Sequence, residues 1–245
     1  MPLKIRLIRT GRRDAFYNMG LDQALLEGAS GGGLPVLRLY GWEPPAVSIG
    51  YFQKISEVVN REACAERGVD IVRRASGGGA VFHQAEITYS VIFPPSRTLP
   101  SFESVCGAVM EGLAILGVSS RFKPVNDIYA GEKKISGNAR IRRGDTLLQH
   151  GTVLLDTDPD LMTELLGVPP GRVTGLRAVL GRSVSFEEAE EALVEGFRRG
   201  LSLEYAGEPG GAAPVSGCFP AAEEEERARV LARERFASPE FTGRS

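Results

Sequence analysis

Hydrophobic and polar residues follow two different periods along the first half of the chain. Where apolar residues recur at every second position, or form a short run bounded by glycine or proline, the pattern predicts a β-strand. Such segments lie at residues 3–8, 36–40, 46–51 and 86–93. Where apolar residues recur every three or four positions, the pattern predicts a helix with one buried face. Such segments lie at residues 14–27, 55–67 and 102–116.

The second half of the chain continues this mixture. Strands are predicted at residues 128–130, 134–141 and 146–155, with short turns between them. Helices are predicted at residues 160–166, 185–201 and 221–236. Ser185, with Glu188 three positions later, forms a capping-box pattern that marks the start of the second of these helices. The chain is therefore expected to mix helices and strands along its whole length.

A change of composition after residue 205 predicts a boundary. Residues 206–214 read AGEPGGAAP, which is typical of a linker. The charge-rich helix at 221–236 follows, with Leu231 and Phe236 as its few apolar anchors. We expect one domain over residues 1–205, then a linker and a C-terminal helical extension over residues 206–245.

Composition and charge exclude several classes of protein. The formal net charge is -2, whereas a nucleic-acid-binding protein carries a clustered basic excess. The three cysteines are widely separated and odd in number, which argues against a disulfide framework and for a reducing compartment. The two histidines and these cysteines show no metal-ligand spacing. Because no segment approaches ~20 apolar residues, we expect a cytoplasmic protein that contacts no membrane.

Three consecutive glycines, Gly77, Gly78 and Gly79, lie between apolar runs at residues 69–73 and 80–83. Backbone N–H groups without neighbouring Cβ atoms approach a bound oxygen closely, and Arg74 and Ser76 add a cation and a hydroxyl beside them. On the glycines alone, a hairpin that merely turns the chain is equally plausible. Arg74 before the loop and His83 after it favour an anion site.

A second informative stretch covers residues 126–155. Lys134 lies where a strand leaves a turn, and a lysine there is usually only solvated. The small residues Ser136, Gly137 and Ala139 follow it and leave space for a ligand. Asn138 is four positions on, so a regular strand places its side chain on the same face as Lys134.

His150 and Thr152 share one face of the next strand by the same rule. Ligand contact and a half-buried structural role are both open for His150.

Four motifs in order now carry a resemblance. The segments RRASGGGAVFH at 73–83, NDI at 126–128, KKISGNA at 133–139 and QHGT at 149–152 resemble the lipoate-protein ligase family of the biotin/lipoate ligase superfamily. The match runs over roughly residues 3–203. It implies an α/β (α+β) fold, a biotin/lipoate ligase-like catalytic domain in which helices pack outside a large mixed β-sheet and a smaller sheet.

The resemblance also implies an ATP-dependent ligase that converts lipoate to lipoyl-AMP and transfers the lipoyl group to an acceptor lysine. Lys134 is the expected catalytic residue, held against the carboxylate and the α-phosphate. Asn126 and Asp127 are expected to face the nucleotide or a magnesium ion, with Asp127 the possible Mg²⁺ ligand. The lipoyl tail is expected in a dry slot lined from Ser48 to Tyr51 and by Val81. The other residues expected to bind substrate or nucleotide are Arg74, Ser76, Gly77, Gly78, Gly79, Ala80, His83, Ser136, Gly137, Asn138, His150 and Thr152.

The implied acceptors are the lipoyl domains of 2-oxoacid dehydrogenase complexes or the glycine cleavage H protein. Many bacterial ligases of the family carry a larger C-terminal accessory domain, so here that part is expected either to be dispensable or to come from a separate accessory protein. Sister families are octanoyl or lipoyl transferases that use a cysteine and no ATP, and residues 40–53 and 86–90 resemble these. They place the cysteine shortly before the lysine segment, where residues 118–129 contain none. The ligase is therefore the main expectation, with the transferase and a non-catalytic lipoate-binding protein as alternatives.

Overall fold

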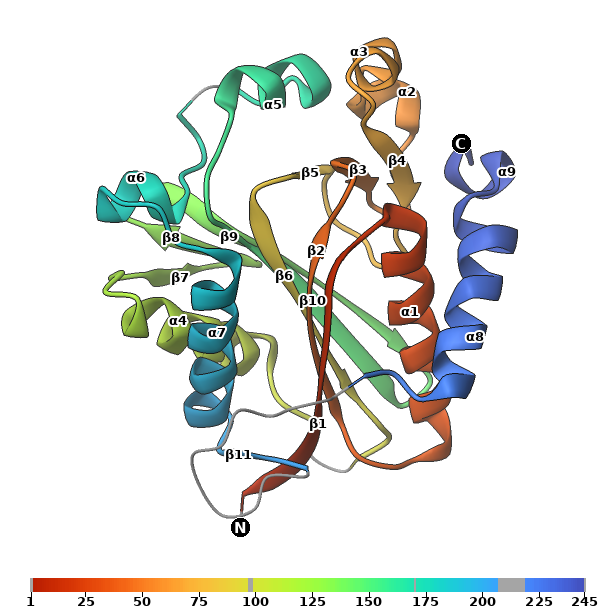
Figure 1. The fold of residues 1–245 in the computed structure, drawn as a ribbon, viewed down its shortest axis with the longest axis vertical. Helices are drawn as coiled ribbons and strands as arrows, with labels where there is room; N and C mark the ends of the chain where they lie inside the picture. Colours follow the sequence, from red (N-terminus) through yellow and green to blue (C-terminus); the bar gives the residue numbers. More distant parts are fainter. Residues whose placement is uncertain (1, 97–98, 170, 207–218, 245) are drawn as a thin grey trace.

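A mixed sheet runs through the centre of the molecule in the computed structural model, which describes residues 2–96, 99–169, 171–206 and 219–244 (Figure 1). Within these residues the sheet has eight strands, and a second sheet has three. The large sheet follows the order β11 (Leu203–Tyr205), β1 (Leu3–Arg13), β2 (Val36–Trp42), β6 (Glu86–Phe93), β10 (Thr146–Leu154), β9 (Lys133–Arg143), β8 (Asp127–Ala130) and β7 (Arg121–Lys123). The small sheet follows the order β4 (Asp70–Arg73), β3 (Ala46–Ile49) and β5 (Val81–His83).

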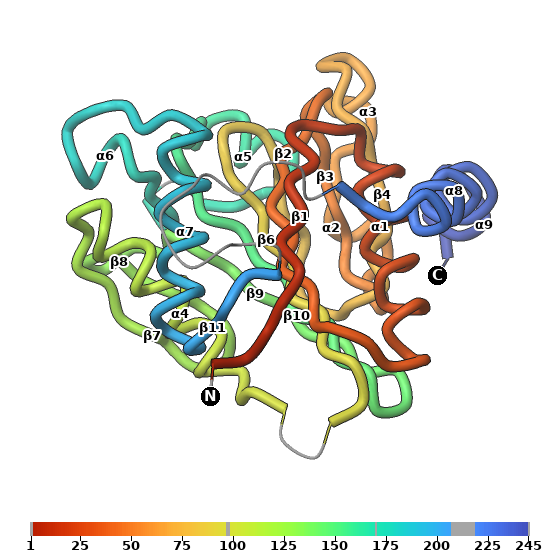
Figure 2. Tube along the Cα trace, turned by 60° about the horizontal axis from the view of Figure 1, so that its bottom comes forward, coloured from red at the N-terminus to blue at the C-terminus, as the bar shows by residue number. Residues whose placement is uncertain are grey.

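Helices cover both faces of the large sheet, because each face carries a separate apolar core (Figures 1 and 2). On one face lie α4 (Phe102–Ile115) and α7 (Phe186–Gly200), and on the other lie α1 (Ala15–Gly28) and α8 (Ala222–Leu231). Helix α1 is sandwiched between the sheet and α8, so it is buried over most of its length. The remaining helical segments are η1 (Ala29–Gly31), α2 (Ile55–Val58), α3 (Arg61–Glu66), α5 (Pro159–Leu166), α6 (Leu176–Leu180), η2 (Ala232–Phe236) and α9 (Pro239–Thr242).

The small sheet has an apolar core of its own, which α3 and α5 close. Its strand β3 follows β2 directly, so the two sheets meet at the turn after Trp42. Residues 74–80, which contain the three glycines, leave the small sheet at β4 and return to it at β5. The glycine loop therefore lies where the two sheets face each other.

Side-chain caps explain where several helices begin. Asp14 accepts a hydrogen bond from the backbone N–H of Tyr17, and Ser185 accepts one from Glu188, as their positions in the sequence predict. Asn60 does the same for Ala63, and this cap starts a new helix. The single helix predicted at 55–67 is therefore wrong, because it is split into α2 and α3.

The fold class inferred from the sequence is confirmed: a large mixed sheet, a smaller sheet and helices outside them. The short elements β7, β11 and α6 were not predicted, because three to five residues carry too little periodicity to detect. The C-terminal helix is present as α8 and η2, with Leu231 and Phe236 buried. The predicted linker lies outside the described residues except for Ala206, and the domain boundary stays a prediction.

Candidate functional site

The glycine loop is not a hairpin. Strand β4 pairs with one side of β3 in parallel, and β5 pairs with its other side antiparallel. The loop must therefore cross over the end of β3, where the backbone N–H of Tyr51 donates to the carbonyl of Ser76 at 2.9 Å. The hairpin alternative is thus wrong, and the loop instead forms one wall of a cavity.

Arg74 holds the loop in this shape. Its buried guanidinium donates to the carbonyls of Gly77 (2.9 Å) and Gly79 (2.6 Å), and to the carbonyl and hydroxyl of Ser48 (both 3.0 Å). Burial lowers the pKa of Arg74 to about 10, which leaves the side chain charged at neutral pH. Arg74 thus organises the loop with its own donors, and the phosphate contact expected of it stays a prediction.

Gly50 lets the loop approach β3 closely, and its replacement is a test of that contact. A Cβ at Gly50 would lie 2.0 Å from the carbonyl oxygen of Gly78, so Gly50→Ala must displace the loop. We expect this variant to lose about 1–3 kcal/mol of unfolding free energy in urea titrations, together with most of its activity. The matched control is Gly28→Ala, since a Cβ at that helical position meets nothing within 4 Å. Equal stability of the two variants would contradict the close approach.

A cavity opens between the glycine loop and strands β9 and β10, with about 560 Å³ of empty space when its mouth is counted. Most of the predicted site residues line it: Ser48, Arg74, Gly78, Gly79, Ala80, Val81, His83, Asn126, Lys134, Gly137, Asn138, His150 and Thr152. Ala139, expected to leave space for a ligand, lines it too, together with residues that the sequence analysis missed: Met19, Tyr40, Trp42, Thr88 and Gly151. We call this space the central cavity.

The other predicted residues lie around the central cavity rather than on its wall. Ser76 lies behind it, beside a small second cavity, and Asp127 lines an adjoining groove that shares Lys134 with the central cavity. Of the slot expected from Ser48 to Tyr51 for the lipoyl tail, only Ser48 lines the central cavity. Gly77 and Ser136 line none of these three spaces, and Ser136 is fully buried.

Lys134 reaches the central cavity because of a bulge in β9. Tyr129 pairs with Lys134 but its neighbour Ile128 pairs with Ser136, so Ile135 is an extra residue that reverses the alternation. Lys134 consequently shares a face with Gly137, where a Cβ would lie 2.6 Å from the lysine Nζ. The prediction that Lys134 and Asn138 share a face is therefore wrong. The Asn138 side chain instead accepts from the buried Tyr89 hydroxyl at 2.7 Å.

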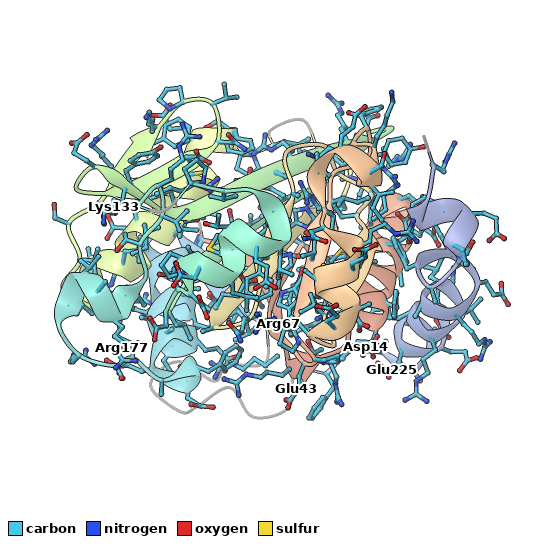
Figure 3. The ribbon with its side chains drawn as sticks, turned by 90° about the horizontal axis from the view of Figure 1, so that it is seen from above. Asp14, Glu43, Arg67, Lys133, Arg177 and Glu225 are labelled. Carbon is cyan, nitrogen blue, oxygen red and sulfur yellow. The ribbon has the colours of Figure 1, made fainter. Side chains whose placement is uncertain are left out.

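The charge of Lys134 is matched by Asp127, whose Oδ1 lies 2.7 Å from Nζ. The Lys134 side chain is 33% exposed, so the amine is neither buried nor simply solvated. Figure 3 labels its neighbour Lys133, which is exposed. In the described part of the chain, no three His, Cys, Asp or Glu side chains gather as a metal site. The magnesium role of Asp127 stays a prediction that depends on the ATP-dependent reaction, and its carboxylate here binds an amine.

Two serine–histidine–carboxylate chains border the cavity, and neither was predicted as a unit. In the first, Ser48 Oγ lies 2.7 Å from His83 Nε2, and His83 Nδ1 lies 2.5 Å from Glu86 Oε1. Sequence alone gave no signal for it, because Ser48 and His83 are brought together only by the pairing of β3 with β5.

In the second chain, Ser76 Oγ lies 2.6 Å from His150 Nε2, and His150 Nδ1 lies 3.2 Å from Asp22 Oδ2. Burial opposes the charge of Asp22, but the hydrogen bond with His150 and the charge of Arg38 outweigh it and lower the pKa of Asp22. His150 is buried and also lines the central cavity. Its position is therefore compatible with both alternatives, a structural role and contact with a ligand.

The two described cysteines lie in apolar cores, away from the central cavity. Burial raises the pKa of Cys106 to about 12, and it also raises that of Cys64. Because the thiolate is the nucleophile, we expect neither residue to react with a thiol reagent in the native protein at pH 8. The check is to treat the native protein and the urea-unfolded protein with the reagent and to locate the labelled cysteines by peptide mass mapping. Rapid native labelling of Cys106 would contradict it. Cys218 lies outside the described residues.

No helix in the described residues is long and apolar enough to span a membrane.

Comparison with known proteins places this site in a family. Residues 14–198 match the model of the lipoyl protein ligase A/B catalytic domain. The octanoyltransferase LipM of Kyrpidia tusciae is 35% identical, over 84% of this chain and 89% of its own length. The LipM octanoyltransferase of Staphylococcus aureus is 30% identical, over 80% of this chain and 87% of its own.

Solved structures agree on the fold. The bipartite lipoate protein ligase of Thermoplasma acidophilum superposes with a TM-score of 0.84 at 28% identity, covering 98% of this chain and 97% of its own. A lipoate-protein ligase A bound with ATP gives a TM-score of 0.84 at 29% identity, with 99% of each chain covered.

These relatives correct the main functional expectation. The chain is similar over most of its length to octanoyltransferases, so the prediction of an ATP-dependent lipoate-protein ligase is wrong, and the transferase alternative is favoured. The error has a physical origin. A glycine loop, a lysine and a cavity suit both the ligase and the transferase reaction, so their presence does not show how the acyl group is activated. The chain belongs to the lipoyl protein ligase A/B catalytic domain family, within the biotin/lipoate ligase superfamily.

Proposed function

We propose that this protein is an acyltransferase that moves an octanoyl or lipoyl group from a thioester donor to a lysine of an acceptor lipoyl domain, without ATP. The observation that carries the proposal is the central cavity, whose wall combines Lys134 with apolar residues such as Met19, Trp42 and Val81. The similarity of the chain to octanoyltransferases supports the choice of reaction.

The cavity residues suit both parts of an acyl thioester. Apolar side chains exclude water from the alkyl chain, while the Lys134 ammonium stabilises the negative charge that develops on the carbonyl oxygen during attack. The wall is mostly apolar, and Lys134, His83 and His150 are among its polar side chains. We expect the acyl group to bind with its carbonyl toward Lys134, where the positive charge lies.

ATP and Mg²⁺ have no role in this reaction, because the thioester is already an activated acyl group. The ATP in one structural relative belongs to that ligase. The lipoic acid bound by the Thermoplasma acidophilum homologue supports a lipoyl group as a guest of the same fold. Lipoyl domains of 2-oxoacid dehydrogenase complexes and the glycine cleavage H protein are the proposed acceptors.

The test is transfer from octanoyl-coenzyme A and from octanoyl-loaded acyl carrier protein to an unmodified lipoyl domain, followed by intact mass. We expect the octanoyl adduct on the acceptor lysine with ATP absent and apyrase present. Addition of ATP, Mg²⁺ and free octanoate in place of the thioester is expected to give none. Transfer that requires ATP, or no transfer from either thioester, would refute the proposal.

A further inference from the structure

The Ser48–His83–Glu86 chain has the geometry of an activated nucleophile. A carboxylate accepts the proton of one ring nitrogen, so the other nitrogen of His83 is left as an acceptor for the Ser48 hydroxyl proton. The two distances, 2.7 Å and 2.5 Å, are those of formed hydrogen bonds. All three residues are buried, which shields the proton path from bulk water.

The ring of His83 is fixed by further contacts. Trp42 stacks on it with a centroid distance of 3.9 Å, and the Trp42 indole N–H donates to Thr88 Oγ1 at 2.8 Å. Thr88 in turn donates to Glu86 Oε1 at 2.8 Å. These residues lie on paired strands rather than loops, so the chain from carboxylate to hydroxyl is preorganised.

Two features distinguish Ser48 from the serine of the other chain. Ser48 lines the central cavity together with Lys134, whereas Ser76 does not. The Arg74 guanidinium also donates to Ser48 Oγ at 3.0 Å, and a cation at that distance stabilises an alkoxide. Neither described cysteine lines the cavity, so Ser48 is placed where a nucleophile is needed.

We propose that Ser48 accepts the acyl group as a covalent ester before it passes to the acceptor lysine. This inference rests on the proposed acyltransferase function. In the first step Ser48 Oγ bonds to the thioester carbonyl carbon, its proton moves to His83 Nε2, and the carbon–sulfur bond breaks as that proton passes to the leaving thiolate. In the second step the acceptor amine attacks the ester carbon, the carbon–oxygen bond breaks, and His83 transfers a proton from the amine to Ser48 Oγ.

Glu86 acts through His83 and is therefore a positioning residue. Glu86→Gln keeps the size of the side chain but removes its charge, and we expect ester formation to slow by roughly 10⁴-fold, the loss seen when a triad carboxylate is neutralised. The donor concentration at half-saturation should stay unchanged in single-turnover measurements. A purely structural role would change stability without this split between rate and affinity.

The experiment incubates the full chain with octanoyl-coenzyme A and no acceptor, then treats the denatured protein with neutral hydroxylamine. We expect one octanoyl adduct that resists hydroxylamine, as an oxygen ester does, and maps to the peptide containing Ser48. Ser48→Ala should lose the adduct, whereas Cys218→Ala should keep it. Ser48→Cys should form an adduct at the same position that neutral hydroxylamine removes, because it is a thioester.

The outcomes distinguish the acylation of Ser48 from the proposed acyltransferase function on which it rests. Transfer to the lipoyl domain by a Ser48→Ala variant that remains folded would overturn the inference and leave the transferase function standing. A hydroxylamine-sensitive adduct in the unaltered protein, mapped to a cysteine, would do the same. Absence of both adduct and transfer would overturn both.

Discussion

Replacing Lys134 with alanine is expected to slow octanoyl transfer by at least about 100-fold, because the charge on the carbonyl oxygen then has no ammonium to stabilise it. The fold should survive. The ion pair with Asp127 is partly exposed, and such pairs contribute about 1 kcal/mol or less to stability. Single-turnover transfer to a lipoyl domain, without ATP, measures the effect.

Lys133→Ala is the matched control for Lys134, since the same residue type is exposed one position earlier on the same strand. We expect transfer at the rate of the unaltered protein. Equal rates for the Lys133 and Lys134 variants would show that the cavity amine has no part in the reaction.

Replacing Arg38 with methionine is expected to cost about 3–5 kcal/mol of unfolding free energy, because it leaves the buried carboxylate of Asp22 without its cationic partner. Arg38 is fully buried and donates to Asp22 at 2.7 Å and to Asn18 Oδ1 at 2.6 Å. Asp22 also holds His150 at the cavity wall, so the loss of Arg38 should disturb the position of His150 in the site as well. Urea unfolding monitored by circular dichroism gives the stability.

The control for Arg38 is Arg182→Met, which removes an exposed guanidinium paired with Glu188 at 2.6 Å. Solvent already screens that pair, so the unfolding free energy should remain close to that of the unaltered protein. If the two arginine variants unfold at the same urea concentration, the buried network around Asp22 contributes little.

The long elements could be predicted from the sequence because their periodicity is strong and their caps are local. Helix α1 begins after Asp14 and α7 after Ser185, as the sequence indicates. The pairing of strands could not be predicted in this way. Strands β4 and β5 pair with opposite sides of β3, so the glycine loop has to cross over the end of β3. This arrangement depends on contacts between segments that are separated in the sequence.

The candidate site was predicted in its parts but not in its geometry. Gly78, Lys134 and His150 do line one cavity, yet the face of Lys134 depends on the bulge at Ile135, which leaves no mark in the alternation of side chains. The type of reaction was predicted wrongly for a related reason. The absence of a cysteine from residues 118–129 favours a ligase in the sequence, but a motif reports only residues that are close together along the chain.

The most direct test of the account is a crystal structure with an octanoyl-coenzyme A analogue whose thioester sulfur is replaced by methylene. We expect the alkyl chain inside the central cavity and the carbonyl oxygen about 3 Å from Lys134 Nζ. An alkyl chain bound outside the cavity, or a carbonyl beyond the reach of Lys134, would contradict it.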